Sequence, residues 1–189
     1  MTDPQILISL AIDDERWRDI DVETDFENFI ESTVRTAFLS ANTAWLPKAN
    51  IIDISIVLTS DDNVQSLNAE YRGKDSPTNV LSFPQFSSEE CTSKPLESLD
   101  FLPLGDIIMA RETILREAGE QNKEINAHFA HLIVHGTLHL LGYDHEIDSE
   151  AIEMETLEVA ILNGLGFDNP YDDTDTDTSS ANGDDIAHG

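Results

Sequence analysis

Short runs of apolar residues mark four expected strands along the chain. Residues 5–12 form one such run, and residues 51–59 alternate isoleucine or leucine with mostly polar side chains. Residues 79–83 and 105–110 are two further runs, the first of which ends at Pro84. Runs of this length and composition are typical of strands with at least one buried face. The sequence therefore predicts a small sheet of about four strands.

Helical spacing of apolar residues, every three or four positions, accounts for most of the remaining chain. Residues 85–103 are the exception, because they are polar and contain two prolines, and we interpret them as an inserted loop. Strands and helices do not alternate regularly, so we expect an α+β fold with a mixed sheet and one long helix that carries four histidines. The expected helices cover about residues 26–38, the segment from a capping Asp61 to Gly73, and residues 111–121, 123–141 and 149–163.

The composition changes at residue 168. A length of 189 residues fits one domain, and we assign it to residues 1–167. Residues 168–189 are almost entirely Asp, Thr, Ser, Asn and Gly, which cannot offset the entropy of ordering the segment. We therefore expect a disordered acidic tail.

Cysteine content and hydropathy limit the class of protein. Cys91 is the single cysteine, so neither an internal disulfide nor a cysteine-based zinc cluster is expected. No apolar run approaches the roughly 20 residues that span a bilayer, and the N-terminus lacks a basic, cleavable leader. We expect a soluble cytoplasmic protein with no membrane partner.

The charge balance is strongly acidic. Ten Lys and Arg face 38 Asp and Glu, for a formal net charge of −28. Such a chain repels polyanions at long range, so composition alone disfavours a nucleic-acid partner. Solubility explains the charge most simply, and a basic partner protein is the alternative.

Three histidines near the C-terminal end of the long helix form the most informative pattern. His135 and His139 are four residues apart, which places both imidazoles on one helix face. Gly142 can end the helix with a positive φ and let the chain return with His145. Three histidines can hold one zinc ion and leave its fourth position open, which is the catalytic arrangement.

The other histidines carry weaker interpretations. We take His128 and His188 as ordinary packing or surface residues. His131 lies one turn before His135, and the sequence leaves open whether it supports the metal site or only packs.

The spacing of the histidine motif is shared with metzincin proteases. Those enzymes carry a glutamate directly after the first histidine as the general base, whereas this chain has Gly136. Peptide hydrolysis by that route is therefore disfavoured. A reaction that depends on charge neutralisation is favoured instead.

A basic pair lies at the end of the second expected helix. Arg72 and Lys74 stand out in a chain with only ten basic residues. Arginine presents a planar fork that suits phosphate oxygens, but a surface cation that pairs with nearby carboxylates has the same appearance. The residues alone do not decide between these roles.

Three motifs in the same order resemble the YbeY family of bacterial rRNA-maturation endoribonucleases. They are the histidine motif at residues 135–145, the block from Tyr71 to Pro84 and the segment 104–107. Together they extend over most of residues 60–165. The resemblance is weaker before residue 50 and absent in the tail.

The resemblance implies a single-strand-specific, zinc-dependent endoribonuclease. It would act in 3′-end maturation of 16S ribosomal RNA and in ribosome quality control, with one zinc per chain. His135, His139 and His145 would be the ligands, and Arg72 with His135 would carry catalysis. Because the chain is acidic, we expect small-subunit proteins or an assembly GTPase to deliver the ribosomal RNA. No DNA partner is expected.

Several alternatives stay open. The chain could be a non-catalytic ribosome assembly factor with structural zinc, or a metal-dependent hydrolase of another substrate. The attacking group could be water or the ribose 2′-OH. Asn79 stands where many family members have Asp, which questions an acid or base role at that position. Asp106 could orient a ligand imidazole or could cap local backbone.

The cations near these motifs lead to one further expectation. Arg72, Lys74, Arg111 and Arg116 lie in or near the motif blocks. We therefore expect a small positive pocket inside a negative shell.

Overall fold

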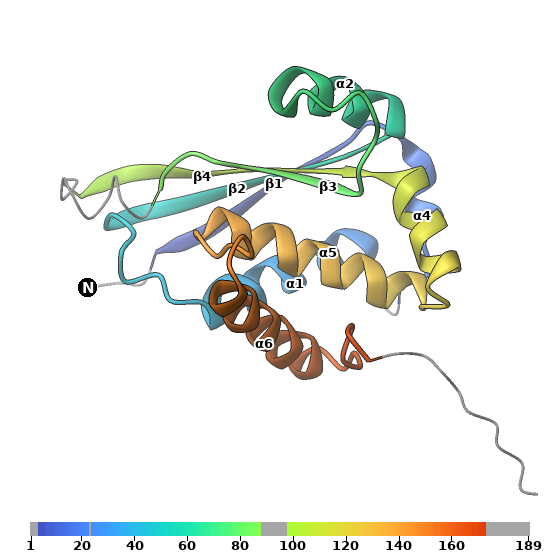
Figure 1. The fold of residues 1–189 in the computed structure, drawn as a ribbon. Coiled ribbons are helices and arrows are strands. Elements are labelled where there is room, and N and C mark those ends of the chain that lie inside the picture. The colour runs from blue at the N-terminus through green and yellow to red at the C-terminus, as the bar shows by residue number, and fades with distance from the viewer. Residues whose placement is uncertain (1–3, 23, 88–97, 173–189) are drawn as a thin grey trace, which may run out of the picture.

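The computed structural model describes residues 4–22, 24–87 and 98–172. Their arrangement is shown in Figure 1. In chain order the elements are β1 (Gln5–Ile12), the 3-10 helix η1 (Glu15–Asp19), α1 (Phe26–Ser40), β2 (Ala49–Thr59), α2 (Asp61–Arg72), β3 (Val80–Pro84), β4 (Leu99–Ala110), α4 (Arg111–Glu120), α5 (Ile125–Leu140) and α6 (Asp148–Gly164).

The four strands form one mixed sheet in the order β1-β2-β4-β3. β1, β2 and β4 run parallel, and β3 runs antiparallel to β4. The helices that join the strands lie on the two sides of this sheet (Figure 1). The predicted α+β class, with a four-stranded mixed sheet, is confirmed.

The two faces of the sheet are covered unequally. α1, α5 and α6 lie on one face, which we call the α5 face, and α2 lies on the other, the α2 face (Figure 1). The main core fills the α5 face, where apolar residues such as Ile54, Ile107 and Phe129 are fully buried. A small cluster of Val64, Leu81 and Ala110 attaches α2. Helix α5, which was predicted to carry the histidines, is the central helix of the layer that covers the α5 face (Figure 1).

One boundary from the sequence was wrong. The expected loop 85–103 ends earlier, because β4 begins at Leu99 and includes Pro103. A proline fits within this strand because β3 pairs with β4 only from Gly105 onward, and the register with β2 shifts directly after Pro103. Proline is tolerated at such edges and bulges because its missing N–H breaks no ladder bond. Residues 88–97, with Cys91, lie outside the described residues.

The expected cap of α2 also differs. Ser60 occupies the N-cap position, and Asp61 is the first residue of the helix. The Asp61 carboxylate instead accepts hydrogen bonds from the backbone N–H and the hydroxyl of Thr113, at 2.9 Å each. The same side chain therefore ties the start of α2 to α4. Among the described residues, no helix is long and apolar enough to cross a membrane.

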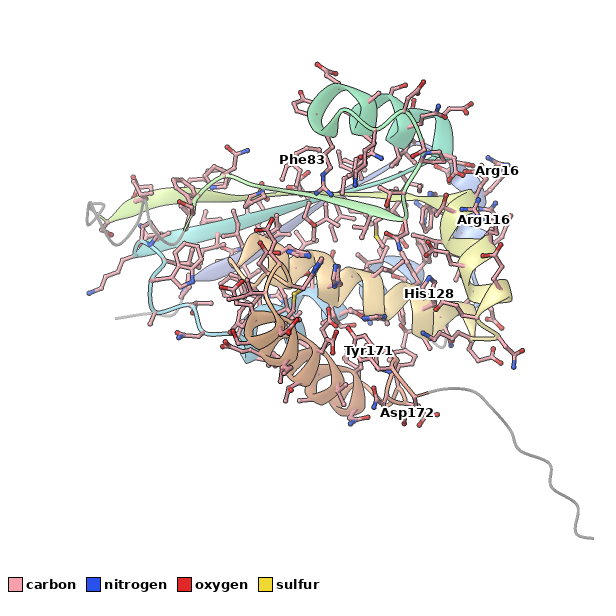
Figure 2. The ribbon with its side chains drawn as sticks, in the orientation of Figure 1. Arg16, Phe83, Arg116, His128, Tyr171 and Asp172 are labelled. Atoms are coloured by element: carbon pink, nitrogen blue, oxygen red, sulfur yellow. The ribbon has the colours of Figure 1, made fainter. Side chains whose placement is uncertain are left out.

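The first residues of the expected tail contact the domain. Lys123 donates a hydrogen bond to the carbonyl of Pro170 at 2.7 Å, and the hydroxyl of Tyr171 donates to Glu158. Figure 2 shows Tyr171 beneath α5, where the chain turns back after α6. Residues 173–189 lie outside the described residues, so the expected disorder of the tail stays a prediction.

Two truncations separate the docked turn from the rest of the tail. We expect removal of residues 173–189 to leave the free energy of unfolding unchanged. Removal of residues 168–189 should lower the free energy of unfolding by roughly 1–2 kcal/mol. A hydrogen bond to a charged group contributes about 1.5–3 kcal/mol, and water that replaces the lost donor restores part of this stabilisation. Urea denaturation of both proteins measures the difference. Equal stability of the two truncated proteins would contradict the docking role of Tyr171.

Candidate metal centre and its cavity

Three histidines come together at the C-terminal end of α5. His135 and His139 lie on one face of the helix, with their Nε2 atoms 3.0 Å apart. The ring of His145 lies 5.5 Å from that of His135 and 5.1 Å from that of His139, between ring centroids. One nitrogen from each of the three residues lies within 4.8 Å of the others. The sequence prediction that these three side chains converge is therefore confirmed.

The turn after α5 returns the third histidine to the cluster. Gly142 has φ +84°, a conformation that favours glycine. The next residue, Tyr143, is fixed at both ends. Its N–H donates to the carbonyl of Leu138, and its hydroxyl accepts from the backbone N–H of Asn42 after α1. The position of His145 therefore depends on contacts with α1 as well as on the local turn.

The cluster suits a transition-metal ion. Nitrogen atoms about 2.0–2.1 Å from a tetrahedral zinc ion lie roughly 3.3 Å from one another, which is close to the 3.0 Å between His135 and His139. Burial, together with the neighbouring His135 and His145, lowers the pKa of His139 to about 4. Metal ligation requires a neutral imidazole. At neutral pH His139 is therefore already in the form that binds metal.

Glu158 of α6 contacts this cluster and was missed by the sequence interpretation. Its side chain is fully buried, and Oε1 lies 2.7 Å from His135 Nδ1. Burial alone would raise the pKa of the carboxyl. Hydrogen bonds with His131, His135 and Tyr171 outweigh it and hold the pKa at about 2. Glu158 is therefore an ionised carboxylate in the interior.

A pattern in the sequence could have identified Glu158. The buried face of α6 consists of Met154, Glu158, Ile161 and Leu162, which recur at helical spacing. An acidic residue at a core position of an amphipathic helix needs a partner. Ile152 of the same helix, although apolar, is 65% exposed.

The remaining described histidines differ in their surroundings. His131 Nε2 lies 3.3 Å from Glu158 Oε2, so His131 contacts the carboxylate that touches His135. This geometry favours the supporting role that the sequence left open. His128 is buried and pairs with Glu117 at 3.1 Å, away from the cluster, as expected for a packing residue. His188 lies outside the described residues.

Arg72 and the three histidines line one cavity of about 620 Å³. Arg72 is the last residue of α2 and is exposed. Within the described ranges, no carboxylate forms an ion pair with its guanidinium. The alternative of a neutralised surface cation is therefore not supported. The free guanidinium and the histidines face the same volume.

The expected positive pocket is smaller than the sequence suggested. Lys74, Arg111 and Arg116 do not line the cavity that holds Arg72. Arg116 lies at the α4 end of the molecule (Figure 2), within 4.0 Å of Asp61 and Glu120. Among the described residues, Arg72 is the cation that lines the cavity.

Asp106 does not orient a ligand imidazole. It lies directly opposite Phe83 in the antiparallel pairing of β3 and β4, so both side chains lie on the same face of the sheet. Phe83 packs in the small cluster beneath α2 (Figure 2). Asp106 is therefore on the α2 face, and the histidines are on the α5 face. The alternation of side chains along β4 decides the question.

Asn79 lines the cavity but acts as a local connector. Its amide donates to Glu117 Oε2 at 2.9 Å, and its side-chain oxygen accepts from the N–H of Val80. An aspartate at this position could not make the first of these bonds, because a carboxylate has no hydrogen to donate. Asn79 therefore joins β3 to α4.

Gly136 faces the sheet where α5 approaches it closely. A Cβ atom at this position would lie 2.9 Å from Ile107 Cγ2 and 3.3 Å from Ser82 Oγ. The glycine therefore permits close packing of α5 on β3 and β4. A glutamate here would point into the sheet and away from the histidines, so the protease arrangement does not fit this packing.

Gly136→Glu should destabilise the protein strongly. We expect a loss of about 3 kcal/mol or more in the free energy of unfolding, because the side chain overpacks the interface and buries an unpaired charge. Ala127→Glu is the matched control, since residue 127 is half-buried in the first turn of α5 and negative charge is favourable there. Denaturation curves measure both. A Gly136→Glu protein as stable as the control would refute the close packing.

The fold and the site define an α+β protein with a three-histidine cluster suited to a metal ion, and comparisons with known proteins identify its family. The model of the family described as Endoribonuclease YbeY matches residues 11–166. The Endoribonuclease YbeY of Paramagnetospirillum magneticum is 49% identical over 137 residues, which is 72% of this chain and 81% of that protein. The chain belongs to the YbeY endoribonuclease family.

A solved structure supports the fold alone. The solution structure of TM1509 from Thermotoga maritima matches with a TM-score of 0.51 and 23% identity. The match covers 85% of this chain and 89% of that one. It agrees with a single fold over most of the described residues.

Proposed function

We propose that this protein is a zinc-dependent endoribonuclease that cleaves single-stranded RNA. Its proposed role is 3′-end maturation of 16S ribosomal RNA and ribosome quality control in the cytoplasm. One observation carries the proposal: Arg72, which has no ion-pair partner among the described residues, lines the same cavity as the three-histidine cluster. Membership of the endoribonuclease family supports the reaction class.

Each residue has a distinct role in this proposal. His135, His139 and His145 hold one zinc ion, which supplies Lewis-acid charge beside a phosphate when it is bound. Arg72 binds the scissile phosphate through its paired N–H groups and stabilises the charge that develops there in the transition state. Arg72 lies at the end of α2, so the two halves of the site come from different layers of the fold.

The accessibility of the cluster favours catalysis over a structural zinc site. Structural zinc sites are closed by four protein ligands, whereas His145 is exposed and the three histidines line an open cavity. This observation weakens the alternative of a non-catalytic ribosome assembly factor. A metal-dependent hydrolase of another substrate would need a specific substrate contact, and Arg72 suits a phosphate.

The acidic surface implies help from a partner. Affinity for RNA normally rests on many Lys and Arg contacts with phosphates, and this chain carries a net charge of −28. We propose that small-subunit proteins or an assembly GTPase position the ribosomal RNA at the cavity. The protein alone should therefore cleave RNA slowly.

A cleavage assay tests the function. The zinc-loaded protein is incubated with a single-stranded RNA, its duplex and the matching DNA, and products are resolved on a gel. We expect cleavage of the single strand alone. Binding of small-subunit RNA without cleavage would favour the assembly-factor alternative. If none of these nucleic acids is cleaved but another phosphate ester is hydrolysed, the alternative of a metal-dependent hydrolase of another substrate is favoured.

A further inference from the structure

The buried carboxylate of Glu158 is an unusual feature of the site. It lies between two imidazoles, with Oε1 2.7 Å from His135 Nδ1 and Oε2 3.3 Å from His131 Nε2. The hydroxyl of Tyr171 donates to the same Oε2. Among the described residues, no lysine or arginine forms an ion pair with it. Donors on α5 and on the docked C-terminal turn therefore stabilise the negative charge.

Two interpretations of this cluster are possible, because His131, His135 and Glu158 could also hold a metal ion. Ligands of one tetrahedral ion lie about 3.3 Å apart. The 2.7 Å between His135 Nδ1 and Glu158 Oε1 is shorter, and it matches a charge-assisted N–H···O bond. A proton, and not a metal ion, fits between these two atoms.

This hydrogen bond determines which nitrogen of His135 is free. An ionised carboxylate only accepts, so Nδ1 must carry the hydrogen. The lone pair of the neutral ring then lies on Nε2, which faces His139 Nε2 at 3.0 Å. The three-histidine cluster therefore receives His135 in the tautomer that a metal requires.

We propose that Glu158 is a positioning residue that fixes the tautomer and the ring orientation of His135, and that Tyr171 holds the Glu158 carboxylate in place. The C-terminal turn thereby becomes part of the metal site although it contributes no ligand. Glu158 and His135 lie on different helices, so the hydrogen bond also sets the distance between α5 and α6 at the cluster. The proposal rests on the three-histidine metal assignment and not on RNA cleavage.

Metal affinity is the first test. Glu158→Gln keeps the shape of the side chain, but its amide can accept from or donate to His135 Nδ1, so both tautomers become possible. We expect the affinity for Zn²⁺, measured by competition with a chromogenic chelator, to fall about 10–100-fold. Glu155→Gln is the matched control. Glu155 is exposed and lies beside Glu158 in the wall of a second cavity, distinct from the one that Arg72 lines. It should retain the affinity of the original protein.

The tautomer itself is the second test and needs neither metal nor RNA. Long-range ¹H–¹⁵N NMR spectra of the metal-free protein distinguish a ring protonated at Nδ1 from one protonated at Nε2. We expect His135 to be protonated at Nδ1 in the original protein and in Glu155→Gln, and to be mixed in Glu158→Gln. A merely structural role for Glu158 would leave the tautomer unchanged.

Tyr171→Phe keeps the test informative if Glu158→Gln fails to fold. The side chain of Tyr171 is 44% exposed, so the change should be tolerated. It removes one donor to Glu158, and we expect a drop in Zn²⁺ affinity smaller than that of Glu158→Gln, with the ring still mainly protonated at Nδ1.

Three results would overturn the proposal. These are an Nε2-protonated His135 in the original protein, unchanged Zn²⁺ affinity in both Glu158→Gln and Tyr171→Phe, or two bound Zn²⁺ ions of which one is lost in Glu158→Gln. The last result would assign the second cluster to a metal. Failure of RNA cleavage would refute the proposed function without affecting these measurements.

Discussion

His139→Ala should purify without zinc. The two remaining imidazoles cannot complete a tetrahedral site in which three histidines are the protein ligands. If three ligands share a binding free energy of about 10–16 kcal/mol equally, the loss of one weakens binding roughly 300- to 8,000-fold. Metal analysis of the purified protein, with the original protein at one zinc per chain, measures the effect.

A matched variant separates loss of a ligand from loss of any histidine on α5. His128→Gln changes a buried histidine of the same helix whose partner is Glu117, and it should retain one zinc. Circular dichroism should give similar helix content for both variants. Full metal occupancy in His139→Ala would remove this residue from the set of ligands.

Arg72→Ala should reduce the turnover of single-stranded RNA by about a hundred- to a thousandfold. Loss of one preorganised donor to the transition state typically costs about 2.7–4 kcal/mol. Zinc content and stability should stay unchanged, because Arg72 is exposed and is not a ligand. Single-turnover cleavage at saturating protein isolates the chemical step from RNA binding.

Two further variants sharpen the Arg72 test. Arg72→Lys should recover only part of the rate, since an ammonium lacks the paired donors of a guanidinium. Lys74→Ala removes a neighbouring cation that does not line the cavity, and it should affect binding more than turnover. Single-turnover cleavage by Arg72→Ala at the rate of the original protein would show that Arg72 only binds RNA.

The sequence by itself determined the α+β class, most helix and strand positions and the three converging histidines. These features are local or periodic. Four residues of helix bring His135 next to His139, and a glycine with positive φ returns His145. The spacing that predicts the three converging histidines is contained in an eleven-residue segment, although a contact with the residues after α1 also holds the turn that carries His145.

The tertiary structure alone decided which carboxylate contacts the histidine cluster. Asp106 lies within one of the three sequence motifs, but strand alternation places it on the α2 face. Glu158 is 23 residues from His135, and only the packing of α6 on α5 brings them to 2.7 Å. Contacts between separate elements depend on which faces are buried together, and a single sequence does not specify those pairings.

The same limit applies to the proposed role of Arg72. The sequence singled out Arg72, but it also grouped three other cations with it. Arg72, at the C-terminal end of α2, lines the histidine cavity, whereas Arg116 pairs with Asp61 and Glu120. The sequence thus determined the three-histidine motif, because that motif is local. Only the tertiary structure decided which charges face it, because those charges come from elements that meet through the core.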